Sequence, residues 1–304
     1  MKFLIKQIPV LWFFLFLIGG VLAINGYFIL KTPSYFTQTV HNQAILPKKT
    51  ANFDSDQVQS VEPKEWVQAK LNEQELFHDF GIGSLYIPSL NIYTPILAGM
   101  ENANLTVAAG TYRESQKMGE GNYILLAHNL VEGGGAFNRI NLLGLNEKIY
   151  LTDFVNVYEY ISTFNQVVSK YQSEYLDTST ASILTLIRCE GGINTDNRLV
   201  VQATLKRMIP VEMEDQEIIR NLGIVVNTQQ YQSDEDKVST NRTILSDQKN
   251  KETSAQFKLS KHSLFQNLCI RFFQLYTIQT QYVVAIFFGG LIVSFLVGRV
   301  RSDE

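Results

Sequence analysis

Two long, uncharged apolar runs lie near the ends of the chain, at residues 8–30 and 282–298. A helix needs about 20 apolar residues to cross a bilayer, so the first run is long enough and the second is near the lower limit. The pattern predicts an uncleaved transmembrane helix at each end. A cleaved signal peptide is the alternative for the first run, and a hydrophobic hairpin or a surface-lying helix is the alternative for the second.

The charges that flank the two runs predict their orientation. Lys2 and Lys6 precede the first run, and Arg299 and Arg301 follow the second. Basic residues concentrate on the cytoplasmic side of membrane helices. We therefore expect both termini in the cytoplasm and everything between the two helices outside the cell.

The chain between the two runs changes its pattern twice. Residues 31–75 are mixed and polar, with one helix expected at about 63–77. Residues 227–257 contain almost no apolar side chains, so they cannot bury enough surface to offset the entropy of ordering, and we interpret them as a flexible tether. The predicted segments are an N-terminal anchor (1–30), an extracellular stalk (31–75), a folded domain (76–210), a polar linker (211–262), and a membrane-proximal segment with the C-terminal helix (263–304).

The pattern of residues 76–210 predicts an all-β domain. Short apolar or alternating runs are separated by turn residues, and Tyr, Ile, Val, Leu and Thr dominate these runs. Such residues favour strands. Only one short helix is expected, near residues 136–143. Many short strands without interleaved helices indicate a β-barrel or a β-sandwich.

The composition narrows the classes of function. Hydrophobic residues make up 45% of the chain, charged residues make up 18%, and the net charge is −3, so nothing in the charge favours a nucleic-acid partner. The chain has two cysteines, Cys189 and Cys269. Two cysteines cannot form a disulfide scaffold, and their spacing fits no metal motif. We expect no cofactor, with calcium possible but unsupported.

Two neighbouring runs predict a β-hairpin that brings a cysteine near an arginine. Side chains alternate between the two faces of residues 183–189, so the leucines share the core face and Cys189 lies on the other face. The next strand begins at Arg198 and carries a uniformly apolar core face. The loop between them, residues 190–197, is rich in Gly and Asn. We therefore expect Cys189 and Arg198 close together on the non-core face.

A histidine completes a candidate catalytic set. His128 ends an apolar strand and enters a glycine-rich loop. An arginine near a cysteine favours the thiolate and can donate to an oxyanion, and a Cys–His pair can carry out acyl transfer. Each residue alone is more often structural, because a strand-end cysteine is commonly a small buried hydrophobe. Outside the cell, however, idle free thiols tend to be oxidised or paired, which favours a functional role for Cys189.

Several motifs in this region resemble those of one family. TLIRC at residues 185–189 is similar to the active-site strand of the class A sortases of Gram-positive bacteria, and RLVV from Arg198 matches the strand that carries their arginine. KMGEGNYILLAHN at residues 117–129 is similar to the strand that delivers their histidine. GSLYIPSLNIYTPILAG and AAGTY match their opening strands. The resemblance covers about residues 81–206.

The resemblance implies a fold and a mechanism. It implies an eight-stranded β-barrel and a cysteine transpeptidase, a thiol enzyme in which Cys189 attacks the Thr–Gly bond of an LPxTG-type sorting signal. His128 would protonate the departing amine, and Arg198 would hold the substrate backbone or the oxyanion. An amine on a lipid II-like cell-wall precursor would then take the acyl group. By position, Leu126 and Ile187 are the candidates for the substrate groove.

The resemblance also implies a cellular location and bears on metal binding. It implies the membrane of a Gram-positive bacterium, with the catalytic domain extracellular. Some class A members use calcium near the groove, but no acidic cluster here is dense enough to support such a site. Cys269 matches no family role, and we interpret it as a membrane-proximal apolar residue.

The sequence departs from the class A pattern in ways that leave alternatives open. Arg188 stands where the family usually has Thr, and the alternation turns it away from the face of Cys189. The second apolar run and the segment GINTDNRLVV are similar to the pilin-polymerising class C members, although no Asp-Pro-Trp lid motif precedes the domain. The alternatives are therefore a pilin-polymerising sortase and a non-catalytic, membrane-tethered scaffold.

Overall fold

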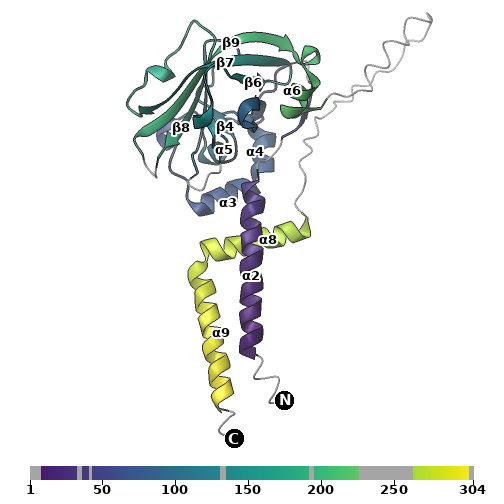
Figure 1. Ribbon diagram of the computed structural model, residues 1–304, viewed down its shortest axis with the longest axis vertical. Coiled ribbons are helices and arrows are strands. Elements are labelled where there is room, and N and C mark those ends of the chain that lie inside the picture. Colours follow the sequence, from purple (N-terminus) through teal and green to yellow (C-terminus); the bar gives the residue numbers. More distant parts are fainter. Residues whose placement is uncertain are drawn as a thin grey trace, which may run out of the picture. The chain divides into compact units, whose positions relative to one another are not determined.

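The computed structural model describes residues 8–32, 36–40, 43–130, 135–191, 195–225 and 263–300, and these form two compact units (Figure 1). The barrel unit contains the described residues of 36–60 and 72–225. The helical unit contains residues 8–32, 61–71 and 263–300. The tether expected at residues 227–257 lies outside the described residues. Each unit has its own buried cluster, so each is considered by itself.

The barrel unit is built on a closed barrel of eight strands, which confirms the predicted fold class. Around the barrel the order is β2-β3-β4-β5-β8-β9-β7-β6. β3 pairs with β4 and β5 pairs with β8 in parallel, and the other neighbours are antiparallel. The strands are β2 (Gly81–Ile87), β3 (Ile92–Leu97), β4 (Ala109–Thr111), β5 (Asn122–Ala127), β6 (Lys148–Thr152), β7 (Asn156–Ser169), β8 (Ile183–Glu190) and β9 (Asn197–Pro210).

Strand alternation fills the barrel as the sequence predicts. Leu184 and Leu186 of β8 are buried in the interior cluster, together with Leu199 and Val201 of β9. Fully burying one such side chain stabilises the fold by about 1.5–3 kcal/mol. Two register shifts in the β7–β9 pair, at Glu159/Tyr160 and Ser162/Phe164, bend the long strands so that the sheet can close.

A second buried cluster lies outside the barrel. It includes residues that precede the first barrel strand and residues that follow the last one. Phe36, Phe77 and Phe154 pack together there from three distant segments. The short strand β1 (Gln38–Thr39) pairs in parallel with β10 (Ile224–Val225). The remaining elements around the barrel are α4 (Glu73–Phe80), α5 (Asn102–Val107), α6 (Gln216–Asn221) and the 3₁₀ turns η1 (Ser55–Gln57), η2 (Pro88–Leu90), η3 (Ile140–Leu142), η4 (Glu174–Leu176) and η5 (Val211–Met213).

The helices differ from the sequence expectations in three places. The single helix expected at 63–77 is two helices, α3 (Pro63–Leu71) and α4, and they belong to different units. The helix expected near 136–143 is only the turn η3, while α5 was not expected at all. Described residues of 36–60 and 211–225 pack with the barrel, although the sequence pattern assigned them to the stalk and the linker.

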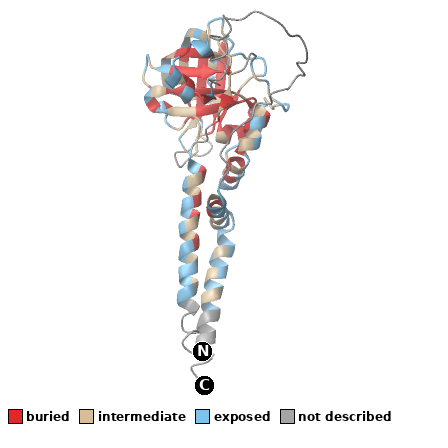
Figure 2. Cartoon of the chain, turned by 90° about the vertical axis from the view of Figure 1, so that its right-hand side faces the viewer, coloured by how far each residue is buried: buried red, intermediate tan, exposed pale blue. Residues whose placement is uncertain are grey.

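The helical unit contains the two apolar runs. Helix α2 (Ile8–Lys31) is long and apolar enough to cross a membrane, and most of its described side chains are exposed (Figure 2). Helices α8 (Leu264–Ile278) and α9 (Thr280–Val300) satisfy the same test only together, and they are bent by 92° relative to each other. The predicted second run lies within α9.

Close packing joins the three long helices. Trp12 Nε1 donates to the Phe287 carbonyl at 3.2 Å, and the Tyr276 hydroxyl donates to the Phe16 carbonyl at 2.9 Å. A Cβ at Gly26 would clash with the backbone of Cys269, so glycine allows α8 to cross α2 closely. The Cys269 side chain is fully buried at this crossing.

Candidate active site

Two of the predicted catalytic residues face each other across the β8–β9 hairpin. The hairpin is present as predicted, and Cys189 pairs with Arg198 in its register. Cys189 is a free, half-buried cysteine near the end of β8. Part of the connecting loop, residues 192–194, lies outside the described residues.

His128 follows the strand on the other side of β8. The parallel β5–β8 register ends with Ala127 opposite Arg188. His128 directly follows Ala127, and Cys189 directly follows Arg188. Adjacent strands lie about 4.8 Å apart. His128, Cys189 and Arg198 therefore lie on or directly after three neighbouring strands, at one rim of the barrel.

The orientation of the His128 ring is set by a residue that the sequence did not single out. His128 is 9% exposed, and its Nε2 lies 3.2 Å from Asn102 Oδ1 at the start of α5. The backbone N–H of Gln59 also donates to Asn102 Oδ1, at 3.0 Å. A backbone N–H can only donate, so this contact identifies the atom as the amide oxygen. Because that oxygen only accepts, Nε2 of His128 is the donor in this contact, so a neutral ring carries its proton on Nε2.

Arg198 is turned toward its own loop. Its Nη1 donates to the carbonyl oxygens of Thr195, at 2.8 Å, and Asn197, at 2.9 Å. These bonds hold the side chain at the rim. To meet a substrate, the guanidinium must use its other N–H groups or exchange these two carbonyls for a substrate oxygen.

Arg188, the unusual residue beside Cys189, is buried on the interior side. It is 6% exposed, and its Nη2 lies 2.7 Å from Glu190 Oε2, an ion pair without hydrogen-bond geometry. Nη2 also donates to Asn141 Oδ1 at 3.4 Å. Burial lowers the pKa of Arg188, and the charges of Glu190 and Cys189 oppose that shift. The guanidinium therefore lies on the opposite face of β8 from Cys189, beside Glu190 and Asn141.

The two candidates for the substrate groove lie side by side on the face of Cys189. Leu126 and Ile187 are register partners in the β5–β8 pair, and Ile187 shares its face with Cys189 two residues on. Both belong to an outer apolar cluster that Phe164 and Tyr175 cover, with their rings stacked at 5.4 Å. An apolar floor therefore leads along β5 and β8 toward the thiol.

A polar network holds the segment that covers this outer cluster. Asn122 Nδ2 donates to the carbonyl oxygens of Tyr175, at 3.0 Å, and Asp177, at 2.9 Å. Its Oδ1 accepts from the buried hydroxyl of Thr185 at 2.6 Å. The segment around η4 is thus fixed to the strands that carry the histidine and the cysteine.

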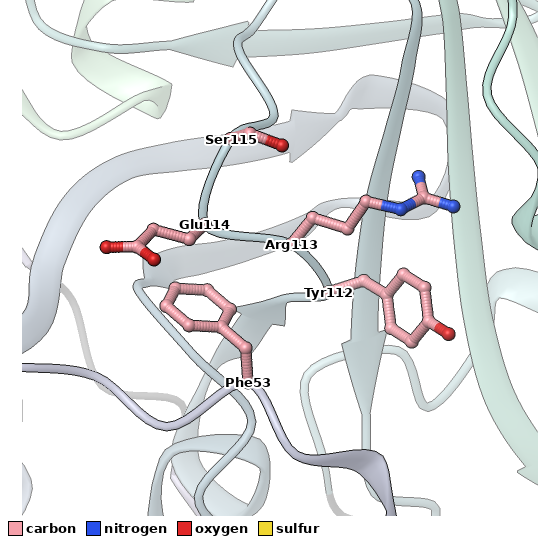
Figure 3. Close-up of a pocket in the computed structure, with 5 residues that line it drawn as sticks. All are labelled: Phe53, Tyr112, Arg113, Glu114 and Ser115. Carbon is pink, nitrogen blue, oxygen red and sulfur yellow. The ribbon is translucent and has the colours of Figure 1, made fainter.

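A separate pocket lies beside the outer cluster (Figure 3). Figure 3 shows Phe53 facing the segment that runs from Tyr112 to Ser115. Arg113 lies over the Tyr112 ring, 5.0 Å from its centroid, and donates to the Leu176 carbonyl. Tyr112 also packs on the outer cluster, so the pocket adjoins the floor without including a predicted catalytic residue.

The part of the chain that the structure describes contains no group of three or more His, Cys, Asp or Glu side chains that could hold a metal ion.

Comparison with known proteins identifies the family. The sortase domain family model matches residues 85–206. Sortase A of Bacillus anthracis is 31% identical over 195 residues, which cover 63% of this chain and 90% of that protein. Sortase A of Listeria monocytogenes is 31% identical over 160 residues, which cover 53% of this chain and 71% of that protein. The solved structure of Listeria monocytogenes sortase A has 30% identity and a TM-score of 0.45, covering 48% of this chain and 98% of that one.

The chain belongs to the sortase family, and its barrel is that of a sortase transpeptidase. The resemblance expected from the motifs is therefore confirmed. The roles of His128, Cys189, Arg198, Leu126 and Ile187 stay predictions.

Proposed function

We propose that this chain is a cysteine transpeptidase that cleaves LPxTG-type sorting signals between Thr and Gly. It passes the acyl group to an amine of a cell-wall precursor and so fixes surface proteins to peptidoglycan. The main support is that Cys189 and Arg198 are register partners while His128 follows the strand that pairs with β8.

The first half of the reaction forms a thioester. The Cys189 thiolate attacks the carbonyl carbon of the signal's threonine, and the carbonyl electrons move onto oxygen. When this intermediate collapses, the C–N bond breaks and the glycine amine leaves with a proton from the His128 imidazolium. The Asn102 oxygen accepts from Nε2, so the transferred proton comes from Nδ1.

The second half transfers the acyl group to the acceptor. The acceptor amine attacks the thioester carbon and gives a proton to Nδ1 of His128, which leaves a new amide and restores the thiolate. Arg198 donates to the oxyanion of both tetrahedral intermediates, where a charged donor is stronger than a neutral one. Leu126 and Ile187 pack against the leucine and proline of the signal.

The first experiment uses the full chain in detergent with an LPxTG-containing peptide and a strong amine nucleophile. Intact-mass spectrometry is expected to show an adduct on Cys189 that resolves onto the amine. Cys189→Ala should abolish both products, while the matched variant Cys269→Ala should retain them, because Cys269 is buried between α2 and α8. Turnover by Cys189→Ala, or a folded wild-type chain that forms no adduct, would count against the proposal and favour a non-catalytic scaffold.

The acceptor distinguishes wall anchoring from pilus polymerisation. The second apolar helix, α9, favours polymerisation, because class C members often carry a C-terminal anchor. The sortase A relatives favour wall anchoring. Competition between a pilin lysine and a wall-precursor amine for the same thioester separates the two, and we expect the wall-precursor amine to win.

We further propose that the protein acts at the membrane of a Gram-positive bacterium. The apolar helix α2 supports anchoring there. The barrel unit would then lie outside the cell, with both termini in the cytoplasm, where the flanking basic residues favour them.

A further inference from the structure

Helix α8 has one side that packs on other helices and one side that does not. The packed side contains Cys269 and Ile270, both buried. The exposed side is mainly apolar, and its most exposed residue, Leu264, has 91% of its surface accessible. The large apolar residues that α8 exposes are Leu264, Phe265, Leu268, Leu275 and Ile278.

The exposed side chains follow a definite order around α8. Phe272 and Tyr276 lie against Gly19, at the middle of α2. Ile270 packs in the cluster that contains Leu30, near the C-terminal end of α2. An α-helix has 3.6 residues per turn. Around α8, from the side of Phe272 and Tyr276 toward the side of Ile270, the first side chains are Leu268, Leu275 and Leu264. Arg271 and Ile278 come next, and Asn267 and Gln274 come last. Leu264, Leu268 and Leu275 therefore form a leucine stripe on the side of α8 nearer the middle of α2. Asn267 and Gln274 form an amide stripe on the side nearer the C-terminal end of α2.

A groove runs along this face. Leu71 of α3 and Gln279, the residue after α8, form part of its wall, and α8 supplies the other lining residues. Its polar groups are one guanidinium, from Arg271, and three side-chain amides, from Asn267, Gln274 and Gln279. Next to them lie the apolar side chains of Leu268, Leu275 and Ile278. A cation and amide donors beside leucines match the phosphate, ester groups and acyl chain of a phospholipid.

The geometry of the unit points to lipid as the occupant. The leucine stripe continues the exposed apolar surface of α2, which only a bilayer would cover in a membrane-anchored chain. The apolar run of α9, residues 282–298, has 17 residues, which is at the lower end of the range of about 17–25 that a membrane span takes, so α9 can cross the hydrocarbon layer without α8. The 92° bend then directs α8 along the membrane surface.

We propose that α8 is an interfacial helix at the membrane surface nearest the C-terminal end of α2. Its leucines lie among the acyl chains, and Arg271 and Gln274 bind the phosphate and ester groups of a phospholipid. This proposal rests on the proposed anchoring by α2. Arg271 lies at the boundary between the two stripes, where a guanidinium meets headgroup phosphate.

Depth measurements test the position of α8 separately from the anchoring. The full chain, with both native cysteines replaced by alanine, carries one fluorophore on Leu268→Cys or Leu17→Cys in vesicles that contain nitroxide lipids. We expect Leu17 to be quenched best by nitroxides deep in the acyl chains and Leu268 by nitroxides near the headgroups. Quenching at Leu17 without quenching at Leu268 overturns the interfacial helix. Quenching of Leu268 mainly by the deep nitroxides overturns it too, since α8 would then be part of a bent span. No quenching at Leu17 overturns the anchoring itself, and the interfacial helix with it.

Native mass spectrometry tests the groove. The full chain in mild detergent is expected to retain phosphatidylglycerol, and Arg271→Gln should reduce retention about tenfold, because one charge-assisted hydrogen bond is lost. Arg220→Gln, which removes an exposed arginine from α6 in the barrel unit, is the matched control and should retain the lipid. Equal retention by both variants, or equal loss, would refute the role of Arg271.

Discussion

At the scale of single residues, the sequence predicted that Cys189 and Arg198 meet, and it missed Asn102, the residue that contacts the His128 ring. Cys189 and Arg198 end and begin consecutive strands, so local alternation was enough to predict that they meet. Asn102 lies 26 positions before His128, and no local pattern relates the two. The contact between Asn102 and the His128 ring is therefore found only in the folded chain.

Removing this acceptor should disturb the histidine and leave substrate binding alone. Asn102→Ala is expected to lower kcat about tenfold, the effect of one lost hydrogen bond, with KM little changed. Nitrogen NMR of His128 should show loss of the pure Nε2–H tautomer in the neutral ring. Asn102→Asp keeps an acceptor and should preserve that tautomer. An unchanged tautomer and kcat in Asn102→Ala would remove Asn102 from the mechanism.

At the scale of elements, the strands were predictable and the short helices were not. Alternating apolar residues mark β8 and β9 because one face of each is buried, and that signal is local. Helix α5 has six residues, too few for a helical period to show, and contacts with distant residues hold it: His128 N donates to the Leu105 carbonyl at 2.9 Å. The helix expected at 63–77 breaks at Asn72, where the chain passes from one unit to the other.

A buried carboxylate joins three strands of the barrel. Glu159 of β7 is 4% exposed and accepts from Arg207 Nε of β9 at 2.7 Å, and Lys148 Nζ of β6 lies 3.4 Å away. Burial alone would raise the pKa of Glu159, but Arg207 and Lys148 hold it below its ordinary value. A carboxyl group with a lowered pKa stabilises the fold above its unfolded pKa of about 4.3, and this contribution is lost as the pH falls through the folded value.

Glu159→Gln should therefore change both the stability and its dependence on pH. We expect the free energy of unfolding at pH 7 to fall by about 1–3 kcal/mol, because Arg207 loses a charged partner. The difference from the wild type should shrink as the pH falls below about 4. Glu120→Gln, which breaks an exposed pair with Lys117, is the control and should change stability by less than about 1 kcal/mol. Denaturant titrations across pH measure both, and a constant difference at every pH would contradict the charge-based explanation.

At the scale of the whole molecule, the limits of the folded unit could not be read from the pattern. Phe36 precedes the predicted domain of 76–210, and Ile219 and Leu222 follow it, yet all three are buried in the second cluster. Polar surroundings conceal such isolated apolar residues in the sequence. They become part of a core only when the two ends of the unit come together around the barrel.

A truncation series tests these limits. Residues 36–225 should unfold cooperatively, whereas residues 76–210 should have a Tm lower by at least about 10 °C, because several large side chains lose their burial. Calorimetry of the two fragments gives the comparison. An intermediate fragment, residues 72–225, keeps the C-terminal part of the cluster and should fall between them. Equal Tm values for all three would show that the second cluster adds no stability.

The parallel pairing of β1 with β10 determines how force enters the enzyme. If both apolar helices hold the chain in the membrane, tension pulls β1 from its first residue, Gln38, and β10 from its last, Val225. In a parallel pair these points lie at opposite ends, so the hydrogen bonds are loaded together in shear instead of being opened one at a time. The two short strands then act as a mechanical clamp, and the load bypasses the barrel. The rim around Cys189 therefore keeps its shape when the two anchored ends are drawn apart, whereas a load applied at Cys189 itself would pass through β8 and the barrel.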